Sequence, residues 1–301
     1  MKPKEDIRAL RTEQLNPAST DLDTKPALEI AQIINAEDAT VAGAVKGAIP
    51  QIAKAIDAVV EAISHGGRLI YVGCGTSGRI AALDASEIPP TFNLSPKTVQ
   101  YVIAGGEKAL GHAAEFNEDS LKDGIRDLAR LKPSAKDVVI GLSASGRTPY
   151  TIAAVEYARN KGAVTGAIVC NAGSELGRVA QIEMVAEVGP EVISGSTRMK
   201  AGTAQKLICN MITTGAMTRL GYVYGNLMVN VHLNNKKLME RGVGILMKAS
   251  GVDHDTAKKT LRASGDQVPV ALIMLKTGVK RKQAEQRLAE ANNNVRRAIK
   301  S

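Results

Sequence analysis

Three short segments of the chain combine glycines with hydroxyl side chains. Residues 73–79 are GCGTSGR, residues 141–147 are GLSASGR and residues 194–202 are SGSTRMKAG. Each follows an apolar run typical of a buried strand and precedes a helical pattern. Hydroxyls, backbone N–H groups and helix N-termini are the groups with which proteins bind phosphate and other anions. A single such turn more often only caps a helix, but three of them predict an anion-binding site.

The first segment also contains the pattern G-x-G-x-x-G, at Gly73, Gly75 and Gly78, which is typical of dinucleotide-binding loops. A dinucleotide site needs an acidic residue about 20 positions further on to bind the ribose, and residues 92–98, FNLSPKT, contain none. The triphosphate-binding pattern G-x-x-x-x-G-K-[ST] is absent as well. Several hydroxyls with few acids suit a sugar monophosphate instead, and we expect no cofactor.

A parallel sheet is needed to position these segments. We expect strands at 68–73, 98–105, 137–144, 164–170 and 182–188, and helices at 77–88, 107–131, 149–161, 174–180 and near 201–219. This alternation predicts an α/β three-layer sandwich with a mostly parallel five-stranded sheet. Because the carboxyl ends of parallel strands share one edge of the sheet, the three segments are expected to lie along that edge.

The rest of the chain is expected to be helical. Residues 1–48 are predicted to form an N-terminal arm with helices, and apolar residues three and four positions apart predict a helix over 49–63 that Gly66 and Gly67 end. Residues 226–250 are predicted to form one helix, followed by three shorter ones. We therefore expect three parts: residues 1–48, a phosphosugar-binding domain at 49–225, and a small helical domain at 226–301.

Composition limits the partners and the compartment. The net charge of +9 arises from residues 236–301, which hold 15 Lys and Arg against 6 Asp and Glu. No aromatic residue lies among these charges, so a solvated helical face is favoured over nucleic-acid binding. The longest apolar helical run, Leu207–Met217, is too short to span a bilayer. We expect a cytoplasmic protein that binds neither nucleic acid nor membrane.

Cysteine and histidine give no sign of metal chemistry. The three cysteines lack a C-x-x-C pattern, and the four histidines share no ligand spacing. These features predict neither disulfides nor a metal site.

Longer stretches carry a resemblance to a known family. YVGCGTSGRIAALDASEIPPTF, LSASGRTPY and EVISGSTRMKAGTAQK resemble bacterial N-acetylmuramic acid 6-phosphate etherases, which have the sugar isomerase (SIS) fold. The helical tail is similar to a three-helix ubiquitin-associated module. The resemblance implies lyase cleavage of the D-lactyl ether in cell-wall sugar recycling, giving N-acetylglucosamine 6-phosphate and D-lactate. It also implies a homodimer with no cofactor.

Such a reaction needs two carboxyl groups in opposite protonation states. Glu87 is expected in the last helical turn before two prolines, where the helix dipole and burial would favour its protonated form. From the residues alone, an exposed glutamate without function is the alternative, and Asp84 competes for the role. The resemblance assigns the acid to Glu87 and the base that removes the C2 proton to Glu118. Near Glu118, Phe116 and Asn117 depart from the usual family sequence.

The other residues expected to contact the substrate lie in or near the three segments. They are Gly75, Thr76, Ser77, Ser143, Ser145, Thr148, Glu191, Ser196, Thr197, Arg198 and Lys200. Glu191 matches a position at which other sugar isomerase enzymes have a catalytic glutamate. Arg198 and Lys200 are candidates to bind the lactyl carboxylate, since charge-assisted hydrogen bonds are strong. Spacing alone does not assign the phosphate to one segment.

Two other functions fit the same fold. A regulatory protein could bind a phosphosugar without turnover, but such regulators usually carry a helix-turn-helix domain or a duplicated fold, and neither is found. A phosphosugar isomerase is the third possibility, and the segment DASEIPP argues against it.

Overall fold

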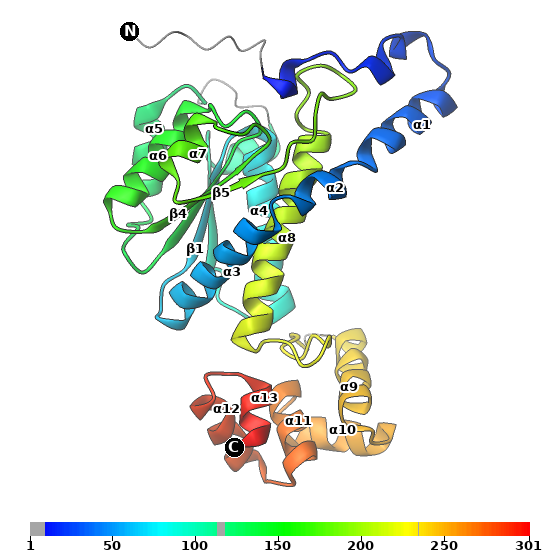
Figure 1. The fold of residues 1–301 in the computed structure, drawn as a ribbon. Coiled ribbons are helices and arrows are strands. Elements are labelled where there is room, and N and C mark those ends of the chain that lie inside the picture. The colour runs from blue at the N-terminus through cyan, green and yellow to red at the C-terminus, as the bar shows by residue number, and fades with distance from the viewer. Residues whose placement is uncertain (1–9, 113–117, 234) are drawn as a thin grey trace. The chain divides into compact units, whose positions relative to one another are not determined.

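The computed structural model describes residues 10–112, 118–233 and 235–301. Their backbone packs into two compact units (Figure 1). Unit 1 comprises Met1–Ala85 and Lys97–Thr213, and unit 2 comprises Ser86–Pro96 and Thr214–Ser301. Two long helices, α4 (Gly75–Phe92) and α8 (Lys200–Leu220), belong partly to each unit. The division into residues 1–48, 49–225 and 226–301 stays a prediction.

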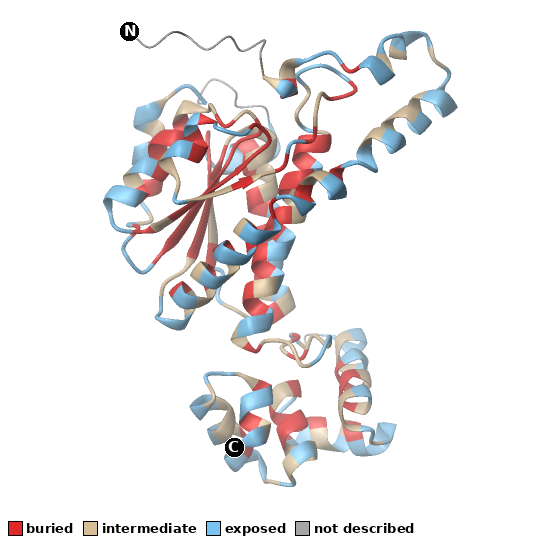
Figure 2. Cartoon of the chain, in the orientation of Figure 1, coloured by how far each residue is buried: buried red, intermediate tan, exposed pale blue. Residues whose placement is uncertain are grey.

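Unit 1 is built on a parallel sheet with the strand order β2-β1-β3-β4-β5. The strands are β1 (Leu69–Gly73), β2 (Val99–Ile103), β3 (Val138–Leu142), β4 (Val164–Val169) and β5 (Ile182–Val185). Every residue of β1 and β3 is buried, as expected for strands with both faces covered, and Figure 2 shows this buried sheet. The predicted fold class is confirmed.

Helices cover both faces of the sheet (Figure 1). On one face lie α5 (Leu121–Ala129), α6 (Pro149–Asn160) and α7 (Glu175–Val179). On the other lie α3 (Ile49–Ser64) and the unit 1 parts of α4 and α8. α3 ends before Gly66, whose φ of +75° is the left-handed conformation of a glycine stop, so the predicted helix over 49–63 is confirmed.

The segment before α3 contains short elements. From residue 10 onward, where the described chain starts, the 3-10 turns Arg11–Glu13, Pro17–Ser19 and Leu22–Thr24 precede α1 (Ala27–Asp38) and α2 (Val41–Lys46). None of the residues of α1 is buried. An amphipathic helix normally gains its stability by burying an apolar face, so α1 has a surface that nothing else in the described chain covers.

α4 does not end where its prolines predicted. We expected the helix to stop at residue 88, but it continues through Pro89 and Pro90 to Phe92. Proline lacks an N–H group and crowds the carbonyl four residues earlier, yet packing can outweigh this cost. Ile88 and Phe92 lie one turn apart and are both buried. Their burial favours continuation of the helix, so Glu87 lies within the helix and not at its end.

The stretch between β2 and β3 is less helical than predicted. In the described residues of this stretch, 107–112 and 118–131, the predicted helix is replaced by a 3-10 turn at Glu107–Leu110 and by α5. Ser120 starts α5 by accepting a hydrogen bond from the Asp123 backbone N–H at 3.2 Å, and this local cap sets the start of the helix. Phe116 and Asn117, the departures from the family sequence, lie outside the described residues.

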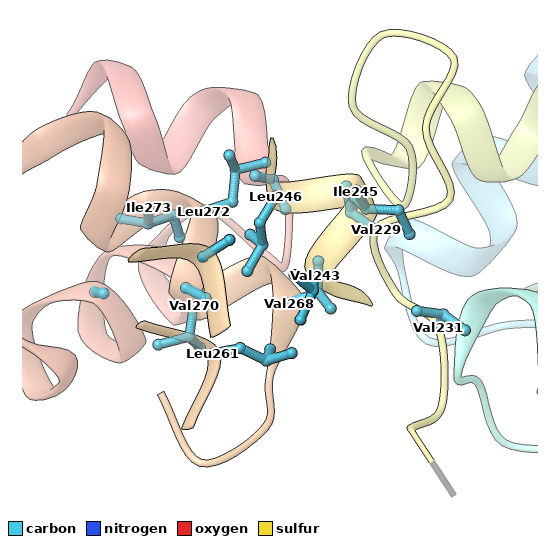
Figure 3. Packing of buried hydrophobic residues seen from close by; sticks show 14 of the residues in the cluster. Val229, Val231, Val243, Ile245, Leu246, Leu261, Val268, Val270, Leu272 and Ile273 are labelled. Atoms are coloured by element: carbon cyan, nitrogen blue, oxygen red, sulfur yellow. The ribbon is translucent and has the colours of Figure 1, made fainter. Parts of the chain in front are cut away.

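Unit 2 has a hydrophobic core of its own (Figure 3). Its helices are α9 (Lys236–Ser250), α10 (His254–Ala263), α11 (Val268–Thr277), α12 (Arg281–Glu290) and α13 (Val295–Lys300). Val243, Leu246, Leu261 and Leu272 are among the buried side chains that pack together there. This part of the chain is therefore helical, as predicted, although two of its boundaries differ.

Asparagines account for both differences in unit 2. Residues 226–233 are not helical, because α9 begins only where Asn235 accepts a hydrogen bond from the Leu238 N–H at 2.9 Å. The last predicted helix is divided into α12 and α13 by Asn292 and Asn293, with φ of +51° and +62°. Asparagine tolerates this left-handed conformation, which ends a helix.

Within the described part of the chain, no helix is both long and apolar enough to cross a membrane.

Candidate active site

Two of the three glycine- and hydroxyl-rich segments leave the sheet side by side in unit 1. Gly73, the last residue of β1, is in register with Leu142, the last residue of β3. The β1–α4 loop and the β3–α6 loop therefore start next to each other at the carboxyl edge. The third segment follows β5 and leads into α8.

The first loop passes directly into α4. Gly75 takes a φ of +51°, which glycine adopts without strain. Gly78 packs so closely on β2 that an added Cβ would lie 2.5 Å from Ile103 Cγ1. Thr76 and Ser77 lie half-buried in the first helical turn, where backbone N–H groups lack helical partners and the dipole is positive. This turn can therefore bind an anion.

The first turn of α4 also contacts the start of α8. Ser77 Oγ donates a hydrogen bond to Gln205 Oε1 at 3.0 Å. A Cβ on Gly202 would lie 3.4 Å from Thr76 Cγ2. These contacts bring the third segment next to the first. The sequence did not reveal Gln205, because nothing local marks a helical glutamine as the partner of a distant hydroxyl.

The β3–α6 loop gathers three hydroxyls in front of α6. Ser143 Oγ lies 3.0 Å from Thr148 Oγ1 and 3.4 Å from Ser145 Oγ, and it accepts a hydrogen bond from the Gly146 N–H at 3.1 Å. Gly146 has a φ of +67°, and a Cβ there would lie 2.3 Å from Ser174 Cβ. Hydroxyls clustered at the N-terminus of a helix suit the oxygens of a phosphate group.

Glu191 caps the N-terminus of α8. Its carboxylate oxygens accept hydrogen bonds from the backbone N–H groups of Lys200 and Ala201, both at 2.9 Å. The side chain is buried, and burial raises the pKa of Glu191 although these two hydrogen bonds act to lower it. Both carboxylate oxygens of Glu191, a predicted substrate-binding residue, are thus already hydrogen-bonded to backbone N–H groups of unit 1.

Lys200 is directed to the N-terminal part of unit 1. Its Nζ lies 2.5 Å from Glu37 Oε2 of α1, and its side chain is only 4% exposed. Asn16 Nδ2 donates to the same carboxylate oxygen at 2.8 Å. The Lys200 hydrogen bond is the main cause that lowers the pKa of Glu37. The other predicted binding residues of this segment are at least partly accessible: Ser196, Thr197 and Arg198.

The two carboxylates considered for the acid have different surroundings. Asp84 is buried in unit 1, where Lys206 Nζ lies 3.2 Å from its Oδ1 and the Tyr71 hydroxyl donates to Oδ2 at 3.3 Å. Glu87 is exposed, so the burial expected for it is not found in the single chain. It lines a cavity of about 480 Å³ in unit 2 together with His232 and Arg241. Asp84 has structural partners, whereas Glu87 is accessible to a ligand.

Glu118 lies in the loop before α5 and is exposed. Its carbonyl accepts a hydrogen bond from the Tyr150 N–H at 3.0 Å, and Tyr150 is two residues beyond Thr148 of the hydroxyl cluster. Burial raises the pKa of Cys74 to about 12, and the charge of Glu118 contributes to this rise. Glu118 is therefore held near the β3–α6 loop, and its negative charge acts on Cys74 of the β1–α4 loop.

The cysteines are poorly suited to nucleophilic chemistry. Cys74, Cys170 and Cys209 are free thiols, and burial raises the pKa of each of them, which disfavours the reactive thiolate. Among the described residues, no group of three or more His, Cys, Asp and Glu side chains is placed to hold a metal ion.

Comparison with known proteins identifies the fold family. A family model for the SIS domain matches residues 112–215, and one for the glucokinase regulatory protein N-terminal SIS domain matches residues 51–159. A solved structure from Bacteroides fragilis, described as a phosphosugar isomerase involved in capsule formation, matches with a TM-score of 0.50. It is 19% identical and covers 69% of this chain and 98% of its own. At this identity the likeness shows the fold alone.

Sequence relatives match almost the whole chain. An N-acetylmuramic acid 6-phosphate etherase of Vibrio parahaemolyticus is 47% identical over 296 residues, 98% of this chain and 99% of the relative. The etherase of Pasteurella multocida is 48% identical over 293 residues, 97% of each chain. The chain therefore belongs to the N-acetylmuramic acid 6-phosphate etherase family.

Proposed function

We propose that the protein is a carbon–oxygen lyase that cleaves the D-lactyl ether of N-acetylmuramic acid 6-phosphate. Its products are N-acetylglucosamine 6-phosphate and D-lactate, so the reaction serves the recycling of cell-wall amino sugars. The observation that carries the proposal is the 47% identity to named etherases over nearly the full length. A regulatory protein of the same fold is not favoured, because relatives at this identity are named as etherases.

The hydroxyl cluster in front of α6 supports a site for the substrate phosphate. The Ser143 hydroxyl lies 3.4 Å from that of Ser145 and 3.0 Å from that of Thr148, and the positive end of the α6 dipole favours an anion there. The first turn of α4, with Gly75, Thr76 and Ser77, starts beside this cluster and can bind the sugar or share the phosphate. Ser196 and Thr197, in the segment whose Gly202 lies against Thr76, are proposed as further substrate contacts.

The chemistry starts from the open-chain sugar, whose aldehyde acidifies the proton on C2. Glu118 acts as the base: it removes this proton, and the electron pair forms the C2–C3 double bond as the C3–oxygen bond breaks. Glu87 acts as the acid that protonates the departing lactate oxygen. Water then adds at C3, its proton restores Glu87, and Glu118 returns the proton to C2.

The proposed acid, Glu87, and the proposed base, Glu118, are both exposed and belong to different units. Glu118 belongs to unit 1 and Glu87 to unit 2. We propose that the protein is a homodimer in which a second copy completes each site. Large apolar side chains exposed on unit 1 support a protein contact there: Leu15, Leu28, Ile49, Leu83, Ile193 and Met211.

We also propose that the enzyme works in the cytoplasm. Its free cysteines suit a reducing compartment. Its proposed substrate, a phosphorylated sugar, is typical of intracellular metabolism. Arg198 and Lys200 remain predicted substrate contacts, although in the single chain Lys200 is already paired with Glu37.

The activity is tested by incubating the protein with N-acetylmuramic acid 6-phosphate in water enriched in ¹⁸O. We expect release of D-lactate without label and incorporation of ¹⁸O at C3 of the sugar, because water adds to carbon after the ether oxygen has left. Label in lactate would indicate a different bond cleavage and contradict the elimination. Binding without lactate release would favour the regulatory alternative.

A further inference from the structure

The unit 2 cavity contains charges of both signs and an apolar wall. It has a volume of about 480 Å³. Its polar side includes Glu87, His232 and Arg241, and its apolar side includes Met228, Val231 and Leu238. The cavity is formed where the end of α4 and the segment before α9 meet the first turns of α9. A ligand group with one charged end and one small apolar end would match this lining.

Arg241 is available to such a ligand. Among the described residues, neither its guanidinium nor the Glu87 carboxylate has a hydrogen-bonding or ion-pairing partner. Arg241 is exposed on α9, so it is not a structural cation of the core. A guanidinium presents a planar set of N–H donors that binds a carboxylate through two parallel hydrogen bonds.

We propose that Arg241 binds the carboxylate of the D-lactyl group, an inference that rests on the etherase activity proposed above. In the substrate, the ether oxygen and the carboxylate are bonded to the same carbon. The acid that protonates the ether oxygen and the cation that binds the carboxylate must therefore be neighbours. Glu87 and Arg241 meet this requirement because they line one cavity.

The remaining parts of the lactyl group also fit the cavity. The carbon between the ether oxygen and the carboxylate carries a methyl group, and Met228, Val231 and Leu238 offer an apolar surface to it. Lys200, another candidate for the carboxylate, is buried and paired with Glu37 in unit 1. Binding the carboxylate there would require that pair to separate, whereas Arg241 needs no such rearrangement.

The test uses the full-length protein and compares two ligands that differ in the lactyl group. Binding of N-acetylmuramic acid 6-phosphate and of N-acetylglucosamine 6-phosphate is measured by calorimetry in the Glu118→Gln background, so that turnover does not interfere. Adding Arg241→Gln should weaken binding of the first ligand about 10- to 100-fold, the range of a charge-assisted pair. Binding of the second, which lacks the carboxylate, should not change.

Two further variants keep the result specific. Arg262→Gln removes the same charge from an exposed position of α10 that does not line the cavity, and it should leave both affinities unchanged. Arg241→Lys should restore part of the lost affinity, because it keeps the charge but not the planar fork. Equal affinities of the Arg241→Gln and parent proteins for the lactyl ligand would overturn the inference, and so would equal losses for both ligands.

The outcome is separable from that of the activity test. If wild-type protein releases no lactate, the proposed function fails whatever Arg241 does. If it releases lactate and Arg241→Gln binds the lactyl ligand normally, only the role of Arg241 fails. A neutral lactamide analogue gives an independent check: it should bind less tightly than the carboxylate to the parent protein but equally to Arg241→Gln.

Discussion

At the scale of single residues, the surroundings of each carboxylate distinguish structural acids from those available for chemistry. Asp84, Glu191 and Glu37 are each engaged by a lysine or by backbone N–H groups. Glu87 and Glu118 are exposed and lie at a cavity and beside a hydroxyl cluster, respectively. From the residues alone, Asp84 competed with Glu87 for the role of the acid, because burial and partners arise only when distant segments come together.

The pair of Lys200 and Glu37 gives a pH-dependent prediction. Glu37→Gln leaves the buried Lys200 ammonium without its ion-pair partner, and we expect a loss of roughly 2–3 kcal/mol in the free energy of unfolding at pH 7, somewhat less than for a fully buried pair. The pKa of Glu37 is lowered in the folded state from an ordinary value of 4.5. Its contribution is therefore present above that value and is lost as the pH falls through the lowered pKa.

Urea unfolding at several pH values checks this prediction. The difference between wild type and Glu37→Gln should be largest near neutral pH and should shrink in acid, where Glu37 becomes protonated. The double variant Glu37→Gln, Lys200→Met should recover part of the stability, since it removes the isolated charge as well. A difference that is the same at all pH values would show that the ion pair does not contribute in this way.

At the scale of elements, the order of strands and helices was predictable, but several boundaries were not. Apolar runs and glycine stops located all five strands and α3. Pro89 and Pro90 wrongly predicted the end of α4, because the burial of Ile88 and Phe92 outweighs the local cost. In the site, the repeated Ser-Gly-Arg marked two loops, whereas Gln205 and Arg241 carry no local signal. Only tertiary packing brings them to Ser77 and to the Glu87 cavity.

The contact of α5 with α6 leads to a prediction about both stability and activity. A Cβ on Gly124 of α5 would lie 2.1 Å from the Tyr150 carbonyl oxygen, and the Tyr150 N–H holds the Glu118 carbonyl at 3.0 Å. Gly124→Ala must push the two helices apart, and we expect a loss of about 1–3 kcal/mol. Because the loop of Glu118 is displaced with them, kcat should fall as well.

A glycine without neighbours provides the control. A Cβ on Gly43 of α2 would meet nothing within 4 Å, so Gly43→Ala should be neutral or stabilise the protein by up to about 1 kcal/mol through helix propensity. Chemical unfolding and steady-state kinetics of both variants decide the matter. If Gly124→Ala were as stable and as active as Gly43→Ala, the packing of α5 on α6 would not position Glu118.

At the scale of the whole molecule, unit 1 exposes apolar surface that a single chain does not cover. Leu28 is 70% exposed on α1, a helix with no buried residue. Such a helix gains little stability by itself, so contact with a second copy is the simplest source of it. The same contact can supply a carboxylate from the other chain, which connects assembly to catalysis.

Mixing two inactive variants tests this connection. If each site takes Glu118 from one chain and Glu87 from the other, a dimer of one Glu87→Gln chain and one Glu118→Gln chain has one site with both native carboxylates. Random exchange of chains should then restore about a quarter of the wild-type rate of lactate release, since half of the dimers are mixed and each has one complete site. Each variant alone should stay nearly inactive. Light scattering must first show that the variants are dimers and exchange chains. With exchange established, no recovery of activity would mean that Glu87 and Glu118 act within one chain.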